Sequence, residues 1–170
     1  WRRTFIFTFT FALSICVVPG LAADPLAAIE KSVRLIDRGE NSLARAYLAP
    51  ALINPRISAM ARSRAYYLRG FSFASEGMPV SALRDFNRAL EFYPANPMAL
   101  FALARLYWDG VGVDQDDGLA LSLFARAGKL GHQDADLFLA LGHLYGRGID
   151  QDISLARGLL TDLAKNGDAL

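Results

Sequence analysis

Three neighbouring aspartates are the residues whose spacing comes nearest to a metal site. They are Asp114, Asp116 and Asp117, and Gly118 follows them. A calcium-binding loop of the EF-hand type needs a bidentate acid at its twelfth position, and counting from Asp114 places Ala125 there. The acidic pattern returns at Asp150 and Asp152, as expected of residues that cap the start of a repeated helix. We therefore expect helix capping, and we predict no metal and no cofactor.

The two histidines lack the neighbours that catalysis requires. His132 falls in a turn and His143 on a helix, and neither stands in a nucleophile motif or a zinc-binding H-E-x-x-H. Gly110 and Gly112 follow a helical stretch rather than a strand, so they do not form a dinucleotide-binding loop. The sequence therefore predicts no catalytic residue, and we expect a protein that is not an enzyme.

The composition excludes further classes of function. The chain has 170 residues, of which 53% are hydrophobic and 21% charged, so it can bury the core of one domain. The formal net charge of +1 provides no electrostatic footprint for nucleic acid. Cys16 is the only cysteine, which excludes an internal disulfide and a zinc site made of several thiolates.

Residues 1–23 have the pattern of a signal peptide. Arg2 and Arg3 precede an apolar run over residues 5–18, and small residues follow up to Ala23. The run is shorter than the ~20 apolar residues that span a bilayer, although an uncleaved membrane anchor is the alternative. The paired arginines leave general or twin-arginine export open. We expect a protein exported to the periplasm or secreted by a Gram-negative bacterium, with membrane contact only through a retained leader.

The middle of the chain has the period of a helix with one apolar face. That face carries Ala82, Leu83, Phe86, Ala89, Leu90 and Tyr93. The other faces carry Arg84, Asp85, Arg88 and Glu91. Residues 76–79 form a turn signal before this helix, with Pro79 suited to its first turn. An earlier helix with its inner side at Tyr66, Gly70 and Phe73 completes a helix-turn-helix unit.

Together these residues resemble the tetratricopeptide repeat. The pattern of that family is matched by Tyr66, Gly70, Phe73, Ala82, Phe86 and Pro94. Its small residues let two antiparallel helices approach closely, and its large residues fill the space beside them. Arg69 stands where the family prefers leucine. We therefore expect the first helix of this unit to pack slightly differently.

A small residue recurs along the chain at nearly constant spacing. Ala44, Ala82, Ala120 and Ala156 are separated by 38, 38 and 36 residues. Each is followed four positions later by a large apolar residue, namely Leu48, Phe86, Phe124 and Leu160. This pattern predicts four units, over residues 26–57, 63–96, 97–134 and 135–170, with the first acting as a cap.

The third and fourth units carry longer, glycine-rich loops and resemble the Sel1-like repeat, a relative of the tetratricopeptide repeat. In the third unit, Leu103-Ala104 stands where that family has Leu-Gly, before a loop that ends at Asp116. In the fourth unit, Leu141-Gly142 is taken as the same pair, before a loop that ends at Asp152. This alignment makes the fourth loop two residues shorter, which would account for the spacing of 36.

The resemblance implies an all-α, right-handed solenoid over residues 24–170, in which the first helix of each unit lines a concave groove. The residues that map onto the groove are Arg64, Tyr67, Phe71, Phe101, Arg105, Trp108, Asp109, His143 and Arg147. Aromatic rings beside guanidinium groups suit peptides with acidic or aromatic anchors. The alternative is that Tyr67 and Phe101 pack between units and that the arginines are merely solvated. We expect a protein or peptide partner, bound without turnover by an adaptor of the bacterial cell envelope.

Two other functions remain open at this point. Some cysteine-rich secreted members of the Sel1-like family are associated with β-lactam binding or hydrolysis, but their units are tied by disulfides, which residues 24–170 cannot form. The chain could also be a repeat segment of a larger envelope protein.

Overall fold

The computed structural model describes residues 24–165, and this part of the chain contains eight α-helices and no strand. The helices are α1 (Pro25–Asp37), α2 (Asn41–Ile53), α3 (Ala59–Ser75), α4 (Pro79–Phe92), α5 (Pro97–Asp109), α6 (Asp117–Lys129), α7 (Ala135–Tyr145) and α8 (Ile153–Lys165). The predicted signal peptide, residues 1–23, lies outside the described residues. Within residues 24–165, no helix is long and apolar enough to cross a membrane.

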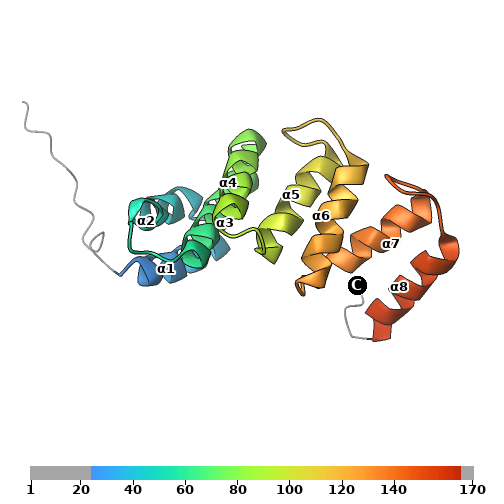
Figure 1. The fold of residues 1–170 in the computed structure, drawn as a ribbon. Helices are drawn as coiled ribbons and strands as arrows, with labels where there is room; N and C mark the ends of the chain where they lie inside the picture. The colour runs from blue at the N-terminus through green and yellow to red at the C-terminus, as the bar shows by residue number, and fades with distance from the viewer. Residues whose placement is uncertain (1–23, 166–170) are drawn as a thin grey trace, which may run out of the picture.

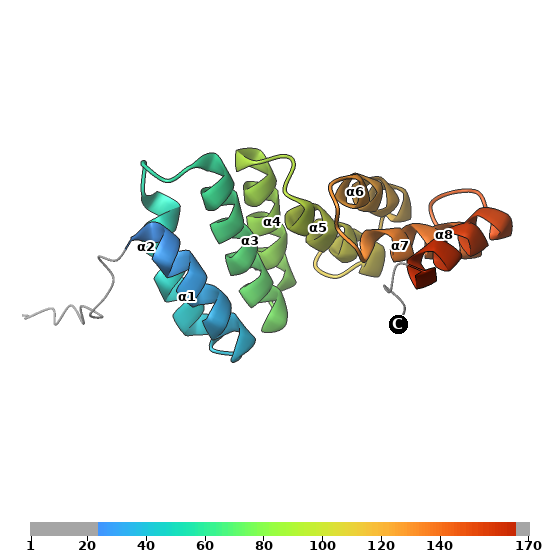
Figure 2. The same cartoon turned by 90° about the horizontal axis from the view of Figure 1, so that it is seen from below.

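The helices form four antiparallel hairpins that stand in a row. Figure 1 shows α1–α2 at one end, α3–α4 and α5–α6 in the middle, and α7–α8 at the other end. Each second helix also contacts the first helix of the next hairpin, and α1, α3 and α5 touch one another in sequence along one side. Figure 2 shows the same row from below. The described chain is therefore an all-α solenoid.

Side-chain caps start several of the helices. Ser58, Asn96 and Asp116 each accept a hydrogen bond from the backbone N–H three residues later. Asp152 does the same for Leu155 at the start of α8, over 2.9 Å. The predicted capping role is confirmed for Asp116 and Asp152.

Close approach within a hairpin depends on Gly70. A Cβ atom placed on Gly70 would lie 2.8 Å from the Phe86 ring and 3.2 Å from the carbonyl oxygen of Ala82. Phe86 and Ala82 are both buried. The predicted steric role of this glycine is confirmed, because any side chain there would separate α3 from α4.

The predicted shortening of the fourth loop is wrong. Gly110 and Gly146 both end a helix in the left-handed region, at φ 64° and 65°. Residues 110–116 and 146–152 then correspond position by position, and each segment ends in a capping aspartate. Ala140, not Gly142, is therefore the counterpart of Ala104, and both alanines are fully buried. The two hairpins repeat every 36 residues throughout, so Gly142 corresponds to Leu106.

Each long loop folds back onto the preceding hairpin. A Cβ atom on Gly112 would lie 2.7 Å from Pro79 at the start of α4. A Cβ atom on Gly148 would lie 2.5 Å from the backbone of Asp117 at the start of α6. Both glycines have positive φ, so loop conformation and loop packing require glycine at the same place.

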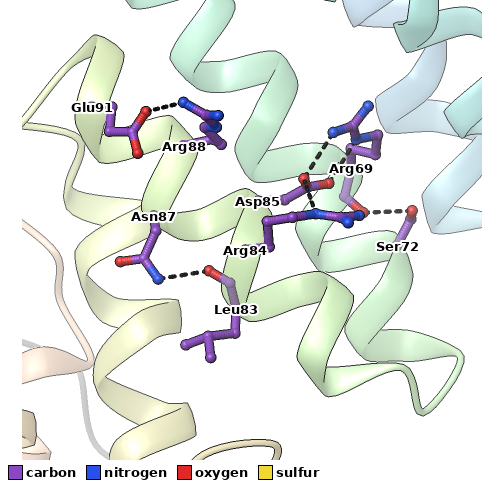
Figure 3. A network of polar contacts seen from close by, with 8 residues as sticks. All are labelled: Arg69, Ser72, Leu83, Arg84, Asp85, Asn87, Arg88 and Glu91. Carbon is purple, nitrogen blue, oxygen red and sulfur yellow. Dashed lines mark hydrogen bonds and ion pairs between the residues drawn. The ribbon is translucent and has the colours of Figure 1, made fainter.

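Asp85 is buried, which corrects the prediction that it lies on a polar face of its helix. The carboxylate is 0% exposed and accepts two hydrogen bonds from Arg69, at 2.6 and 2.8 Å (Figure 3). The Arg69 guanidinium also lies 5.1 Å from the Tyr66 ring centroid. Arg69, where the repeat family has leucine, therefore ties α3 to α4 through an ion pair in which the carboxylate is buried and the guanidinium is partly exposed.

A candidate peptide-binding cleft on the first helices

A cleft of about 750 Å³ opens on the side of the solenoid where α1, α3 and α5 follow one another. Its lining includes Val33 and Ile36 of α1, Met60, Arg64, Tyr67 and Phe71 of α3, and Met98 of α5. The side chains of Met60, Phe71 and Met98 are substantially exposed. The cleft is thus a mainly apolar surface to which these three helices contribute, together with the α4–α5 connection and Leu130.

The face of α3 that borders the cleft follows from helical spacing. Met60, Arg64, Tyr67 and Phe71 stand at intervals of four, three and four residues, which places them in one line on a helix. The Tyr67 ring packs against Phe71, with ring centroids 6.2 Å apart, and against Phe86, at 6.0 Å. Burial raises the pKa of the Tyr67 hydroxyl above its ordinary value, so this group stays neutral and able to donate a hydrogen bond.

Arg64 is held at the rim of the cleft by an exposed ion pair. Its guanidinium donates to Glu30 of α1 over 2.7 Å, and both side chains are about half exposed. Such a pair contributes roughly 0–1 kcal/mol to stability. Exchange of Glu30 for another carboxylate at this position therefore costs little.

A buried amide supports the wall of the cleft at the start of α5. Asn96 donates from its Nδ2 to Ser63 Oγ over 2.9 Å, and its Oδ1 accepts from the Ala99 N–H. Asn96 and Ser63 are both buried. This contact fixes the end of α4–α5 connection against α3, and hence the position of Met98 beside the cleft.

The cleft contains three of the nine predicted groove residues, Arg64, Tyr67 and Phe71. Arg105 and Asp109 lie elsewhere, on the exposed side of α5, where they pair with each other over 3.1 Å. Phe101 is half-buried and stacks on His132 with ring centroids 4.0 Å apart. These three residues of α5 are not part of the cleft lining.

Trp108 is a core residue, which corrects its placement on an open groove surface. Its side chain is 6% exposed and packs edge-on against Phe124 and Phe138, with ring centroids about 6 Å away. Arg147 lies over the ring, 3.7 Å from its centroid, and donates to the Trp108 carbonyl over 2.9 Å. Asp117 holds the same guanidinium in two hydrogen bonds. Arg147 therefore joins the third hairpin to the fourth.

The histidines lie in two different places. His143 borders a smaller depression formed by α6, α7, α8 and the α7–α8 loop, and leucine side chains from all three helices take part in its lining. His132 is half-buried against Phe101, and this burial lowers its pKa although Asp134 acts in the opposite direction. Within residues 24–165, no group of three or more histidine, cysteine or acidic side chains is placed to hold a metal ion.

Sequence reasoning missed the two methionines of the cleft and the buried polar pairs. Met60 shares the helical line of Arg64, so the 3.6-residue period was an available signal. Met98 comes from the next helix, and its position depends on how far α5 is displaced from α3. Nothing in local spacing indicates that displacement.

The comparisons with known proteins agree with the division of the chain into helical hairpins. The sequence model of the Sel1 repeat family matches residues 97–132 and 133–168. Residues 97–168 thus match two consecutive Sel1 repeats. The matched residues correspond to α5–α6 and α7–α8, which form the second half of the described solenoid. No curated protein matches the chain.

Two solved structures share the fold. A Sel1 repeat protein from Oxalobacter formigenes has 18% sequence identity and a TM-score of 0.65, and the match covers 83% of this chain and 55% of that one. A protective antigen of uropathogenic Escherichia coli strains, with an SLR fold, has 21% identity and a TM-score of 0.68, covering 85% of this chain and 31% of that one. This chain thus spans about half and about a third of these proteins, and at such identities the likeness shows the fold alone.

Proposed function

We propose that this Sel1-like chain is a non-catalytic interaction module that binds a peptide segment of a partner protein in the cleft of α1, α3 and α5. Sel1 repeats generally mediate protein–protein interactions. The observation that supports this site is the group of exposed apolar side chains from α3 and α5, namely Met60, Phe71 and Met98. A contiguous apolar patch on the surface of a protein is typical of a binding site.

The lining favours an apolar or aromatic anchor with a carboxylate beside it. Methionine side chains adapt to the shape of different anchors, and the Phe71 ring provides a flat contact. Arg64 presents a guanidinium whose present partner, Glu30, is exposed and replaceable. The neutral Tyr67 hydroxyl can donate to a peptide carbonyl.

Binding can be tested with a displayed library of random peptides selected on the full chain. We expect the selected peptides to share an aromatic or aliphatic residue next to an acid. Phe71→Ser should weaken them about tenfold or more, because it removes a central apolar contact. The matched control is Val80→Ser, which changes an exposed apolar residue of α4 that is not in the cleft.

The outcome discriminates between this site and adventitious stickiness. Peptides that bind Phe71→Ser as tightly as the unaltered chain, or that lose equal affinity with Val80→Ser, would exclude the cleft. Arg64→Glu should reverse the preference from acidic to basic peptides, since it inverts the charge at the rim.

We propose further that the module acts in the envelope of a Gram-negative bacterium, in the periplasm or after secretion. The support is the basic, apolar and small-residue pattern of residues 1–23. The mass of the mature protein from a bacterial host tests this, because export by cleavage predicts a new N-terminus after Ala22 or Ala23.

A further inference from the structure

The outer face of the α7–α8 hairpin carries apolar side chains in a depression of about 470 Å³. The lining comprises Leu144 of α7 and Ile153, Arg157, Leu160, Thr161 and Ala164 of α8. Ile153 is 51% exposed, and Leu144 and Leu160 are each partly exposed. We call this surface the end face. It is separate from the cleft described above.

The preceding hairpin shows what fits on such a face. By the 36-residue repeat, Leu144 and Leu160 are the counterparts of Trp108 and Phe124. Those two rings are buried under Phe138 of α7, which stacks on Phe124 at 4.5 Å and lies 6.0 Å from Trp108. The end face therefore continues an interface that, one hairpin earlier, receives a large apolar side chain from the first helix of the next hairpin.

The first hairpin shows how the arginine of this face is used. The spacings of 38, 38 and 36 residues make Arg157 the counterpart of Arg45 in α2. Arg45 pairs with Glu76 over 2.8 Å and donates to Ser72 over 3.3 Å. Ser72 lies on α3, the first helix of the next hairpin, and Glu76 caps the C-terminal end of α3. Arg45 also lies 4.6 Å from the centroid of the Phe73 ring. An arginine at this position thus receives a carboxylate from the next helix in line.

The helix that meets Arg45 also provides the apolar contact. Leu68 of α3 is the counterpart of Phe138 and packs in one buried cluster with Leu48, the counterpart of Leu160. Leu68 lies on α3, and Glu76, eight residues later, is the C-terminal cap of the same helix. The same helix therefore supplies an apolar anchor and, eight residues later, an acid.

A second copy of this chain does not have the complementary surface. In α1, the counterparts of Leu68, Ser72 and Glu76 are Glu30, Arg34 and Arg38, since the first two hairpins are 38 residues apart. A copy stacked head to tail would therefore place Arg34 and Arg38 against Arg157, and a carboxylate against Leu160. Like charges and a buried acid make this arrangement unfavourable.

We propose that the end face docks a helix of a partner protein that carries a large apolar side chain and, eight residues later, a carboxylate. The apolar side chain packs between Leu144 and Leu160, and the carboxylate pairs with Arg157. In the third hairpin, Asp117 binds Arg147 of the next hairpin. Ile153 is the counterpart of Asp117 in the fourth hairpin, so a following repeat identical to the fourth would have no carboxylate to pair with its arginine. The partner helix therefore resembles α3, which carries an apolar anchor and an acid eight residues later, rather than α7.

The test uses two labelled synthetic peptides with the sequence of residues 58–78, one unaltered and one with Glu76→Lys. Their binding to the full chain is measured by fluorescence anisotropy. We expect the unaltered peptide to bind at least about tenfold more tightly, because Arg157 attracts its carboxylate. Arg157→Glu, a change at an exposed position, should reverse this order, whereas Phe71→Ser in the separate cleft should leave both affinities unchanged.

Three results of the peptide experiment would overturn the proposal: equal affinity for the two peptides, an order of affinities that Arg157→Glu leaves intact, or no binding of either peptide. Leu160→Asp should weaken both peptides, and circular dichroism of this variant reports whether α8 remains folded. Sedimentation of the full chain tests the other occupant. A dimer that Leu160→Asp or Arg157→Glu dissociates would assign the end face to a second copy and overturn the proposal.

Discussion

The guanidinium carbon of Arg147 lies 3.7 Å from the centroid of the Trp108 ring, across the junction of the third and fourth hairpins. The two residues are 39 positions apart, and Asp117 fixes the arginine from the opposite hairpin. Packing between the third and fourth hairpins thus includes a cation held between an aromatic ring and a carboxylate. This contact leads to the first two predictions.

Arg147→Ala should lower the free energy of unfolding by about 1–2 kcal/mol, because it removes a cation–π contact and a charge-assisted hydrogen-bonded pair. Asp117→Asn should cost less, and the double variant should lose less than the sum of the two. Urea unfolding of all four proteins measures the coupling. Strict additivity would show that the pair does not interact in solution.

The same pair should make stability depend on pH in the acid range. The Arg147 guanidinium holds the pKa of the Asp117 carboxyl below its ordinary value of 3.8. The carboxylate therefore contributes stability above pH 3.8, and this contribution is lost as the pH falls through the lowered pKa. The stability difference between the unaltered chain and Asp117→Asn should shrink below pH 3.8. In the Arg147→Ala background it should be small at every pH.

Arg69→Ala should destabilise the chain by about 3–5 kcal/mol, because it leaves the Asp85 carboxylate buried without its bidentate partner. The double variant Arg69→Leu with Asp85→Leu should recover most of this loss, since apolar residues of similar volume often replace buried ion pairs without cost. Thermal and urea unfolding check both. A double variant as unstable as Arg69→Ala would show that leucines do not pack at this site.

Two glycines should respond to alanine in opposite ways. Gly70→Ala should cost about 1–3 kcal/mol, because the new methyl group meets the Phe86 ring and the Ala82 carbonyl. Gly158→Ala in α8 has open space around its Cβ, so it should stabilise the helix by about 0.5–1 kcal/mol. Unfolding midpoints measured side by side give the comparison, and a shift of the same sign in both would contradict it.

Helical period and turn signals were enough to predict the hairpins. The spacing of Ala44, Ala82, Ala120 and Ala156 marks one buried position per unit, and all four alanines are fully buried. Glycine and proline at the turns separate the helices that these alanines join. Local rules therefore locate elements whose ends are determined by residues close in sequence.

The errors arose where a side chain's environment depends on a distant residue. Asp85 borders the apolar stripe of α4, and only the arrival of Arg69 from α3 makes its burial favourable. Trp108 stands near a helix end, and Arg147 and Phe138 of another hairpin cover it. Ala140 and Gly142 are both small, so local sequence alone does not show that Ala140 is the counterpart of Ala104. Arg69 in a leucine position was the one available signal, since a charged residue facing a partner helix needs a counter-charge.

The contacts of the long loops with the preceding hairpins have a consequence for how the repeat region can evolve. Gly112 and Gly148 press main chain against the start of the preceding hairpin's second helix. These loop contacts contribute to how the second, third and fourth hairpins sit against one another, and they do not involve the cleft residues Arg64 and Phe71. Exposed cleft residues such as Arg64 and Phe71 can therefore be exchanged without disturbing these loop contacts, so new specificities can arise on an unchanged arrangement of the hairpins.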